Sequence, residues 1–235
     1  MKKHIPNAIT CCNLISGCIA IVFALDGILD MALLFIIVGA VFDFFDGMSA
    51  RLLGISSPIG KELDSLADVV TFGVAPSAII FSFLSKSQEL PSLIPFLAFV
   101  MAAFSALRLA KFNLDERQAL GFIGLPTPAN ALFWGSVITW LDFQTLFEPY
   151  RLPLYIYYGV VAMMFVSCYL LVAELPLFAL KFKHWGWKGN EVKYIFIITS
   201  ALMIAGPLIL HLSVIGIAAA IAWYVVLSAA TCKRV

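Results

Sequence analysis

Eight apolar runs, each about as long as a membrane-spanning helix, occupy most of the chain. A helix needs roughly 20 residues to cross the hydrocarbon core of a bilayer. The runs are separated by short segments rich in charges, glycine or proline. We predict spans over residues 8–25, 31–53, 61–84, 92–112, 129–147, 154–180, 194–210 and 213–231. The last two have so short a connection that they could form one broken hairpin.

The composition agrees with a membrane protein. Hydrophobic residues make up 62% of the chain, charged residues 12%, and the mean hydropathy is +1.00. Soluble globular domains contain about 25% charged residues. We therefore predict an all-α integral membrane fold, a polytopic helical bundle of about eight transmembrane helices in a single membrane domain over residues 1–235. The sequence shows no internal repeat, which weakens the case for a transporter built from repeats.

Basic residues are strongly biased toward one side of this topology. With an even number of spans both termini lie on the same side, and 13 of the 15 Lys and Arg residues fall there. Only Lys86 and Arg151 fall on the opposite side. Because Lys and Arg concentrate in cytoplasmic loops, we expect a multi-pass protein of the cell (inner) membrane with both termini in the cytoplasm.

Four aspartates interrupt the second and third spans: Asp43, Asp46, Asp64 and Asp68. An ionisable residue at membrane depth costs at least ~2.5 kcal/mol, and these four carry charge of the same sign. At about 100° per residue, the two aspartates of each span share one narrow helix face. The Gly, Ser and Pro segment 54–60 favours a tight antiparallel hairpin, so the two acidic faces can meet.

Four carboxylates at this depth require either protonation or bound divalent cations. Ligands that are all oxygen favour Mg²⁺ or Mn²⁺ over zinc. Two such metals about 4 Å apart are a common device for displacement at phosphorus. The small residues Gly47, Ala50 and Gly60 would let a ligand approach the backbone, and Arg51 suits a phosphate group.

The spacing of these residues resembles the signature of the CDP-alcohol phosphotransferase family. Eight specified residues lie within 26 positions in the pattern Asp43-x2-Asp46-Gly47-x2-Ala50-Arg51-x8-Gly60-x3-Asp64-x3-Asp68. The resemblance implies an intramembrane enzyme, usually a homodimer, with a six-helix core. Such an enzyme transfers a phosphatidyl group from a CDP-linked lipid to an alcohol and releases CMP. On this chain the core would span residues 5–180, with the motif at 43–68 and a C-terminal helical hairpin at 192–231.

The resemblance also implies roles for individual residues. Two divalent cations, Mg²⁺ or Mn²⁺, would be held by Asp43, Asp46, Asp64 and Asp68. The nucleotide pocket would be lined by Asp46, Gly47, Ala50, Gly60 and Asp64. Asp68 would also be the general base for the attacking hydroxyl.

Other segments resemble the phosphatidylserine synthase branch of this family. They are IPNAITCCNLISGCIAIVFAL, SALRLAKFN and GFIGLPTPANA, and more loosely KFK at 181–183. The resemblance covers about residues 5 to 135 and implies CDP-diacylglycerol and L-serine as substrates.

Three polar residues of the first span, Asn7, Thr10 and Asn13, are spaced three apart and therefore share a helix face. They could donate hydrogen bonds to the diphosphate of the CDP lipid. In the alternative, Asn7 is a helix cap and Asn13 makes a hydrogen bond between helices.

Candidates for serine binding lie at the cytoplasmic ends of later spans. Arg108 and Lys111 lie one turn apart, and a guanidinium suits the serine carboxylate. Both could instead be ordinary cytoplasmic positive charge. Thr127, between two prolines, could contact serine or cap a helix, and Glu174 could bind the serine ammonium or pair with a basic residue.

Three alternative functions remain open. The same transfer could use glycerol 3-phosphate, inositol phosphate or choline, although a phosphorylated acceptor should require more basic residues near the pocket. A cation transporter would distribute acids across the membrane, whereas these four cluster near the cytoplasmic ends of adjacent spans. An inactive lipid-binding scaffold would not need all four aspartates.

Overall fold

The predicted spans are present as helices in the computed structural model, which describes residues 4–54, 57–114, 122–147, 152–178, 186–187, 190–209 and 214–231. The first half contains α1 (Ile5–Leu25), α2 (Leu29–Leu53), α3 (Pro58–Asp68), the π-helix η2 (Val69–Val74), α4 (Ala75–Ser85), the 3₁₀-helix η3 (Ile94–Ala98) and α5 (Phe99–Leu114). The second half contains α6 (Thr127–Phe147), α7 (Leu154–Val172), α8 (Glu191–Ile209) and α9 (Ile215–Thr231), with the short strands β1 (Phe122–Ile123) and β2 (Pro176–Leu177).

Five of the described helical segments are long and apolar enough to cross a membrane, and α9 is a shorter apolar helix. The five are Ile5–Leu25, Leu29–Leu53, Pro58–Ser85, Ile94–Leu114 and Leu154–Val172. These segments confirm the predicted all-α, polytopic membrane class.

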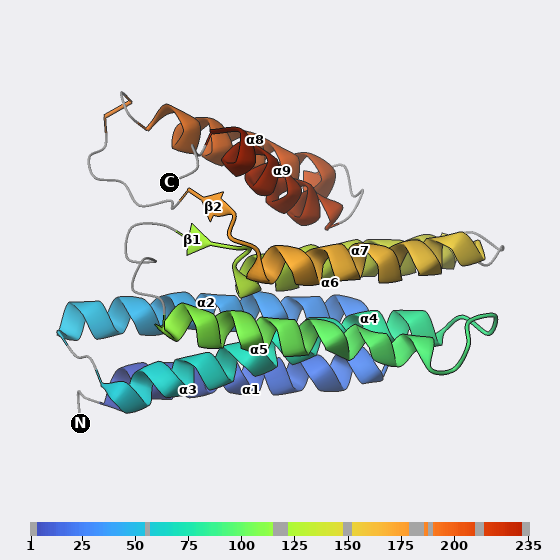
Figure 1. Ribbon diagram of the computed structural model, residues 1–235, viewed down its shortest axis with the longest axis horizontal. Helices are drawn as coiled ribbons and strands as arrows, with labels where there is room; N and C mark the ends of the chain where they lie inside the picture. Colours follow the sequence, from blue (N-terminus) through green and yellow to red (C-terminus); the bar gives the residue numbers. More distant parts are fainter. Residues whose placement is uncertain are drawn as a thin grey trace.

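The helices run side by side along the long axis of the molecule (Figure 1). Helix α1 packs along α2 and also contacts α3, η2 and α4. Helix α6 packs against α2 and α4 and also against α9, so it connects the first five helices with the hairpin of α8 and α9. Helix α1 begins and α9 ends at the same end of the bundle, as an even number of spans requires (Figure 1).

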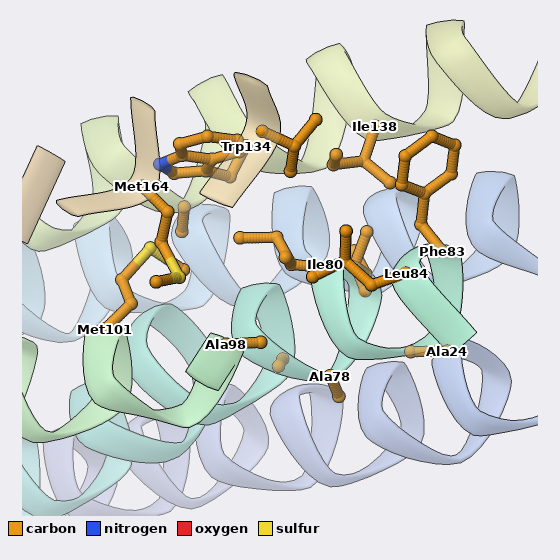
Figure 2. Packing of buried hydrophobic residues seen from close by; sticks show 14 of the residues in the cluster. Ala24, Ala78, Ile80, Phe83, Leu84, Ala98, Met101, Trp134, Ile138 and Met164 are labelled. Atoms are coloured by element: carbon orange, nitrogen blue, oxygen red, sulfur yellow. The ribbon is translucent and has the colours of Figure 1, made fainter. Parts of the chain in front are cut away.

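The third span lies at the centre of this arrangement. In its most apolar window, 72% of the residues of Pro58–Ser85 are buried, against 28–33% in the other four spans. Figure 2 shows Ile80, Phe83 and Leu84 of α4 facing Trp134 and Ile138 of α6 in the buried core. Because lipid tails are as apolar as these side chains, close packing rather than removal from water holds such helices together. The central span also carries Asp64 and Asp68.

The sixth span was predicted to continue to residue 180, and this prediction was wrong. Helix α7 ends at Val172, and Ala173 adopts an extended conformation. The chain then forms β2, which pairs antiparallel with β1 at Phe122↔Leu177 and Ile123↔Pro176. Pro176 prevents the helix from continuing to residue 180, because a proline disfavours helix in the residue before it.

The third span contains a π-helical segment that the sequence did not predict. Helix α3 ends at Asp68, and η2 follows directly before α4 continues the span. Isolated π-helical turns inside α-helices occur frequently at functional sites. In this protein the π-helical segment directly follows Asp68, the last aspartate of the motif.

Candidate functional site

The acidic hairpin is built by local signals at the ends of two helices. Helix α2 ends at Leu53 and is capped by Gly54, whose φ of 64° is easily adopted only without a side chain. The N–H of Gly54 bonds to the carbonyls of the last turn. Helix α3 begins with Ser57 as its N-cap, and the Ser57 hydroxyl accepts a 3.0 Å hydrogen bond from the N–H of Gly60. Pro58 occupies the first turn, where its missing N–H does no harm. The connection is therefore short, as predicted.

Three of the four aspartates converge into one cluster. Asp43 of α2 and Asp64 and Asp68 of α3 each place a carboxylate oxygen within 4.8 Å of the other two. Asp68 is buried, and Asp43 and Asp64 are half-buried. At about this separation and an effective dielectric constant near 20, each ionised pair repels by roughly 3 kcal/mol. Three charged carboxylates at this spacing therefore require a cation.

The donors of this cluster fit a hard divalent cation. Carboxylate oxygens are the ligands that Mg²⁺ and Mn²⁺ prefer, and three of them meet here from two helices. Asp46 is also buried on the same helix as Asp43, but it is not part of the group of three.

Helix α1 brings its polar face to these aspartates. The Thr10 hydroxyl donates to Asp46 Oδ2 at 2.6 Å, and Asn13 Nδ2 donates to Asp68 Oδ1 at 3.2 Å. Asn7 lies beside the start of α3, where its side-chain oxygen would be 3.1 Å from a Cβ placed on Gly60. Asn7 lies inside α1, whose N-cap is His4, so the alternative role of Asn7 as a cap was wrong. The alternative of an interhelical hydrogen bond from Asn13 is confirmed.

The small residues of the motif differ in their surroundings. A Cβ on Gly47 would meet no atom within 4 Å, so a ligand could approach the backbone there, and Ala50 one turn later is half-buried. A Cβ on Gly60 would lie 2.9 Å from Ser57 Oγ, so a larger residue there would displace the N-cap side chain of α3. Arg51 is exposed, and its Nε donates to the Gly47 carbonyl at 3.0 Å. Of the five N–H donors of a guanidinium, this bond uses one.

The predicted serine-binding residues differ in burial. Arg108 of α5 is 6% exposed, lies close enough to Asp68 for their charges to interact, and has its guanidinium 5.0 Å from the centre of the Phe112 ring. Its Nε has no hydrogen-bond partner among the described residues. Lys111 is exposed. The Thr127 side chain is fully buried at the start of α6, and its hydroxyl has no partner within the described ranges.

Glu174 lies after the end of α7, in the segment leading to β2, and so not within a span as predicted. The KFK segment at 181–183 lies outside the described residues.

Ser105 was quoted in the sequence analysis only as the first residue of SALRLAKFN and was not singled out as a site residue. The Ser105 side chain is fully buried one turn before Arg108, and its hydroxyl lacks a partner in the described part of the chain. It packs against η2, where a Cβ on Gly73 would lie 3.2 Å from Ser105 Cβ. The available signal was its place in the SALRLAKFN segment, which indicates no role for the individual serine.

Comparisons with known proteins agree with this site. The family model described as CDP-alcohol phosphatidyltransferase matches residues 3–166. The CDP-diacylglycerol–serine O-phosphatidyltransferase of Bacillus subtilis is 42% identical over 141 residues, which cover 60% of this chain and 76% of that protein. The enzyme of the same name from Helicobacter pylori is 36% identical over 129 residues, or 54% of each chain. The archaetidylserine synthase of Methanothermobacter thermautotrophicus is 33% identical over 130 residues, again 54% of each chain. The alignments thus span about half the length of the latter two relatives.

Proposed function

Because the chain belongs to the CDP-alcohol phosphatidyltransferase family, we propose that it transfers the phosphatidyl group of CDP-diacylglycerol to the hydroxyl of L-serine. The products are phosphatidylserine and CMP. The observation that carries this proposal is the convergence of Asp43, Asp64 and Asp68. The names of similar proteins support serine as the acceptor, because those from Bacillus subtilis and Helicobacter pylori are serine O-phosphatidyltransferases.

Asp43, Asp46, Asp64 and Asp68 hold two divalent cations in this proposal. A divalent cation held there would supply the positive charge that offsets the diphosphate and the departing phosphate of CMP. Asp68 accepts the proton of the serine hydroxyl as general base. The serine oxygen forms a bond to the phosphorus that carries diacylglycerol, and the bond from that phosphorus to the CMP oxygen breaks. The apolar walls of the bundle keep competing water from the phosphatidyl group.

The nucleotide and its lipid bind beside the same hairpin in this proposal. The open space at Gly47 and the exposed guanidinium of Arg51 support a diphosphate there. The remaining proposed contacts come from Asn7, Thr10, Asp46, Ala50, Gly60 and Asp64.

Arg108 binds the serine carboxylate in this proposal. Its burial beside Asp68 and its unused Nε support that role, because a buried guanidinium gains most from a bidentate carboxylate. One buried cation suits a zwitterionic acceptor better than a phosphorylated one. Thr127 offers a buried hydroxyl to the same ligand, and the exposed Lys111 attracts it toward the entrance.

The protein acts as a single membrane domain, and as a homodimer, with both termini and the opening of the active site on the cytoplasmic side of the cell membrane. The core of this domain spans residues 5–180, and the hairpin at 192–231 contains α8 and α9, which lie beyond the residues matched by the family model. In the predicted topology most Lys and Arg residues fall on the same side of the membrane as the two termini, which supports this orientation.

The test is CMP release by the purified protein with CDP-diacylglycerol and Mn²⁺ or Mg²⁺, in the presence and absence of L-serine. Asp68→Asn should abolish the serine-dependent release. Asp142→Asn is a matched control, because Asp142 pairs with Lys86 and is not one of the four aspartates. It should leave release unchanged. Release only with glycerol 3-phosphate, inositol phosphate or choline would overturn serine as the acceptor, and release with none of them would overturn the transferase.

A further inference from the structure

We propose that Asn13 is a positioning residue for Asp68: from α1, its side-chain amide holds the Asp68 carboxylate in the orientation that the acid cluster requires. Asn13 Nδ2 donates to Asp68 Oδ1 at 3.2 Å. The role of Asp68 as base and metal ligand is that of the proposed function, on which this inference rests. Asn13 therefore acts on the reaction through Asp68 rather than through the nucleotide.

A second hydrogen bond fixes Asn13 itself. The hydroxyl of Thr71 in η2 donates to the backbone oxygen of Asn13 at 3.0 Å. Asn13 in turn bonds to Asp68, three residues before Thr71 in the same span. The two bonds run in opposite directions between the same two segments. Together they set the position of α1 along the third span.

The packing around Thr71 leaves Asn13 little room to move. The Asn13 and Thr71 side chains are both fully buried. A Cβ on Gly17 of α1 would lie 2.7 Å from Thr71 Cα, and one on Gly39 of α2 would lie 2.5 Å from Thr71 Cγ2 and 3.0 Å from Asn13 Oδ1. Small residues at such crossings allow helix backbones to approach closely. Three segments, α1, α2 and η2, therefore meet at this residue.

The other end of the Asn13 amide argues against a purely structural role. Asn13 Oδ1 is buried and has no partner among the residues that the structure describes. A buried polar atom without a partner costs about 1–3 kcal/mol, and a small apolar side chain would fill the junction without that cost. An asparagine also supplies a donor without adding a fifth negative charge. A carboxylate has about four lone-pair sites, so this single bond leaves most of Asp68 available to a cation and to the acceptor hydroxyl.

The experiment compares Asn13→Ala and Asn13→Asp with the control Ser16→Ala. Asn13→Asp keeps the shape of the side chain but replaces the donor with an acceptor. Ser16 lies on the same helix, is also buried, and bonds only to the Cys12 carbonyl among the described residues. Two quantities are measured: kcat and KM for CMP release, and the Mn²⁺ concentration at which half of the metal-induced rise in Tm occurs without substrates.

Loss of a hydrogen-bonding partner of a metal ligand typically costs 10- to 100-fold in activity or metal affinity. We expect both Asn13 variants to lower kcat by about this factor, with KM for serine little changed, and to raise the Mn²⁺ midpoint by about tenfold. Ser16→Ala should change neither quantity. In an Asp68→Asn background, Asn13→Ala should have no further effect on the Mn²⁺ midpoint, because residue 68 then has no carboxylate for Asn13 to orient toward the metal.

Two results would overturn the inference. An unchanged Mn²⁺ midpoint and kcat with a lower metal-free Tm would make Asn13 a packing residue only. An equal shift of the midpoint in the wild-type and Asp68→Asn backgrounds would show that Asn13 acts independently of Asp68. The Mn²⁺ midpoint requires no acceptor, so it decides the role of Asn13 even if serine proves to be the wrong substrate.

Discussion

At the residue scale, the acidic side chains of the site form a cluster, whereas Arg108 is a single buried basic side chain. Asp43, Asp64 and Asp68 form a group of acidic side chains whose oxygens suit a divalent cation. Arg108 is a single buried guanidinium beside them, held against Phe112. Its interaction with Asp68 provides part of the compensation that a buried charge requires. A zwitterionic acceptor between the two would pair its carboxylate with Arg108 and bring its hydroxyl near Asp68.

Replacing Arg108 with lysine tests this arrangement. The substitution keeps the charge but removes the planar pair of donors. Hydrogen bonds to charged groups contribute about 1.5–3 kcal/mol each, so we expect kcat/KM for serine to fall roughly 10- to 100-fold, mostly through KM. The measurement is serine-dependent CMP release, and Lys111→Arg, the reverse change at the exposed neighbour, is the control. Equal losses in the two variants would contradict a specific contact from Arg108.

At the element scale, close helix crossings bring the site together. Helix α1 supplies hydrogen-bond donors to α2 through Thr10 and to α3 through Asn13. The register of α3 against α5 is set separately, by bonds from Asn113 to Ser65 at 2.7 Å and from Lys61 to the Asn113 carbonyl at 3.0 Å. The third span and α5 run antiparallel, so the same register places Ser105 of α5 beside Gly73 of η2. The π-helical segment η2 lies between these two interfaces.

Two glycine-to-alanine variants of α2 should therefore behave differently. At Gly39 a methyl group would collide with Thr71 and Asn13, and overpacking typically costs about 1–3 kcal/mol. We expect Gly39→Ala to lower Tm and, by displacing Asn13, also CMP release. At Gly47 a methyl group meets no atom within 4 Å, so Gly47→Ala should keep Tm and raise KM for CDP-diacylglycerol. An unchanged KM would contradict an approach of the nucleotide to the Gly47 backbone.

At the scale of the whole molecule, the acidic span is the most enclosed of the candidate spans. Its aspartates lie nearer the end of the bundle at which α1 begins than the end at which α4 finishes (Figure 1). Among the described residues, this end carries five basic residues and the other end carries Lys86; the five are Arg51, Lys61, Arg108, Lys111 and Lys193. A soluble acceptor would therefore reach the cluster from the side that the charge bias assigns to the cytoplasm.

Cysteine labelling in intact cells tests this orientation. In a background without the five native cysteines, we place one cysteine at exposed Gln88, between α4 and η3, or at exposed Leu114, at the end of α5. A membrane-impermeant thiol reagent should label Gln88→Cys in intact cells and Leu114→Cys only after permeabilisation. The opposite pattern would reverse the proposed topology.

The sequence by itself determined the number and approximate limits of the helices, the acidic hairpin, and the faces on which Thr10, Asn13 and the aspartates lie. These features depend on local information, because a segment in lipid must satisfy its own backbone hydrogen bonds and therefore shows its length and periodicity directly. The tertiary structure alone decided the early end of α7, the β1–β2 pair, the π-helical turn after Asp68, and the burial of Ser105 beside Arg108. It also decided that Asn13 bonds to Asp68. Each of these features depends on which residues distant in the chain come into contact. Close packing around small residues such as Gly17 and Gly39 sets those contacts. A periodic pattern along a single helix does not reveal them.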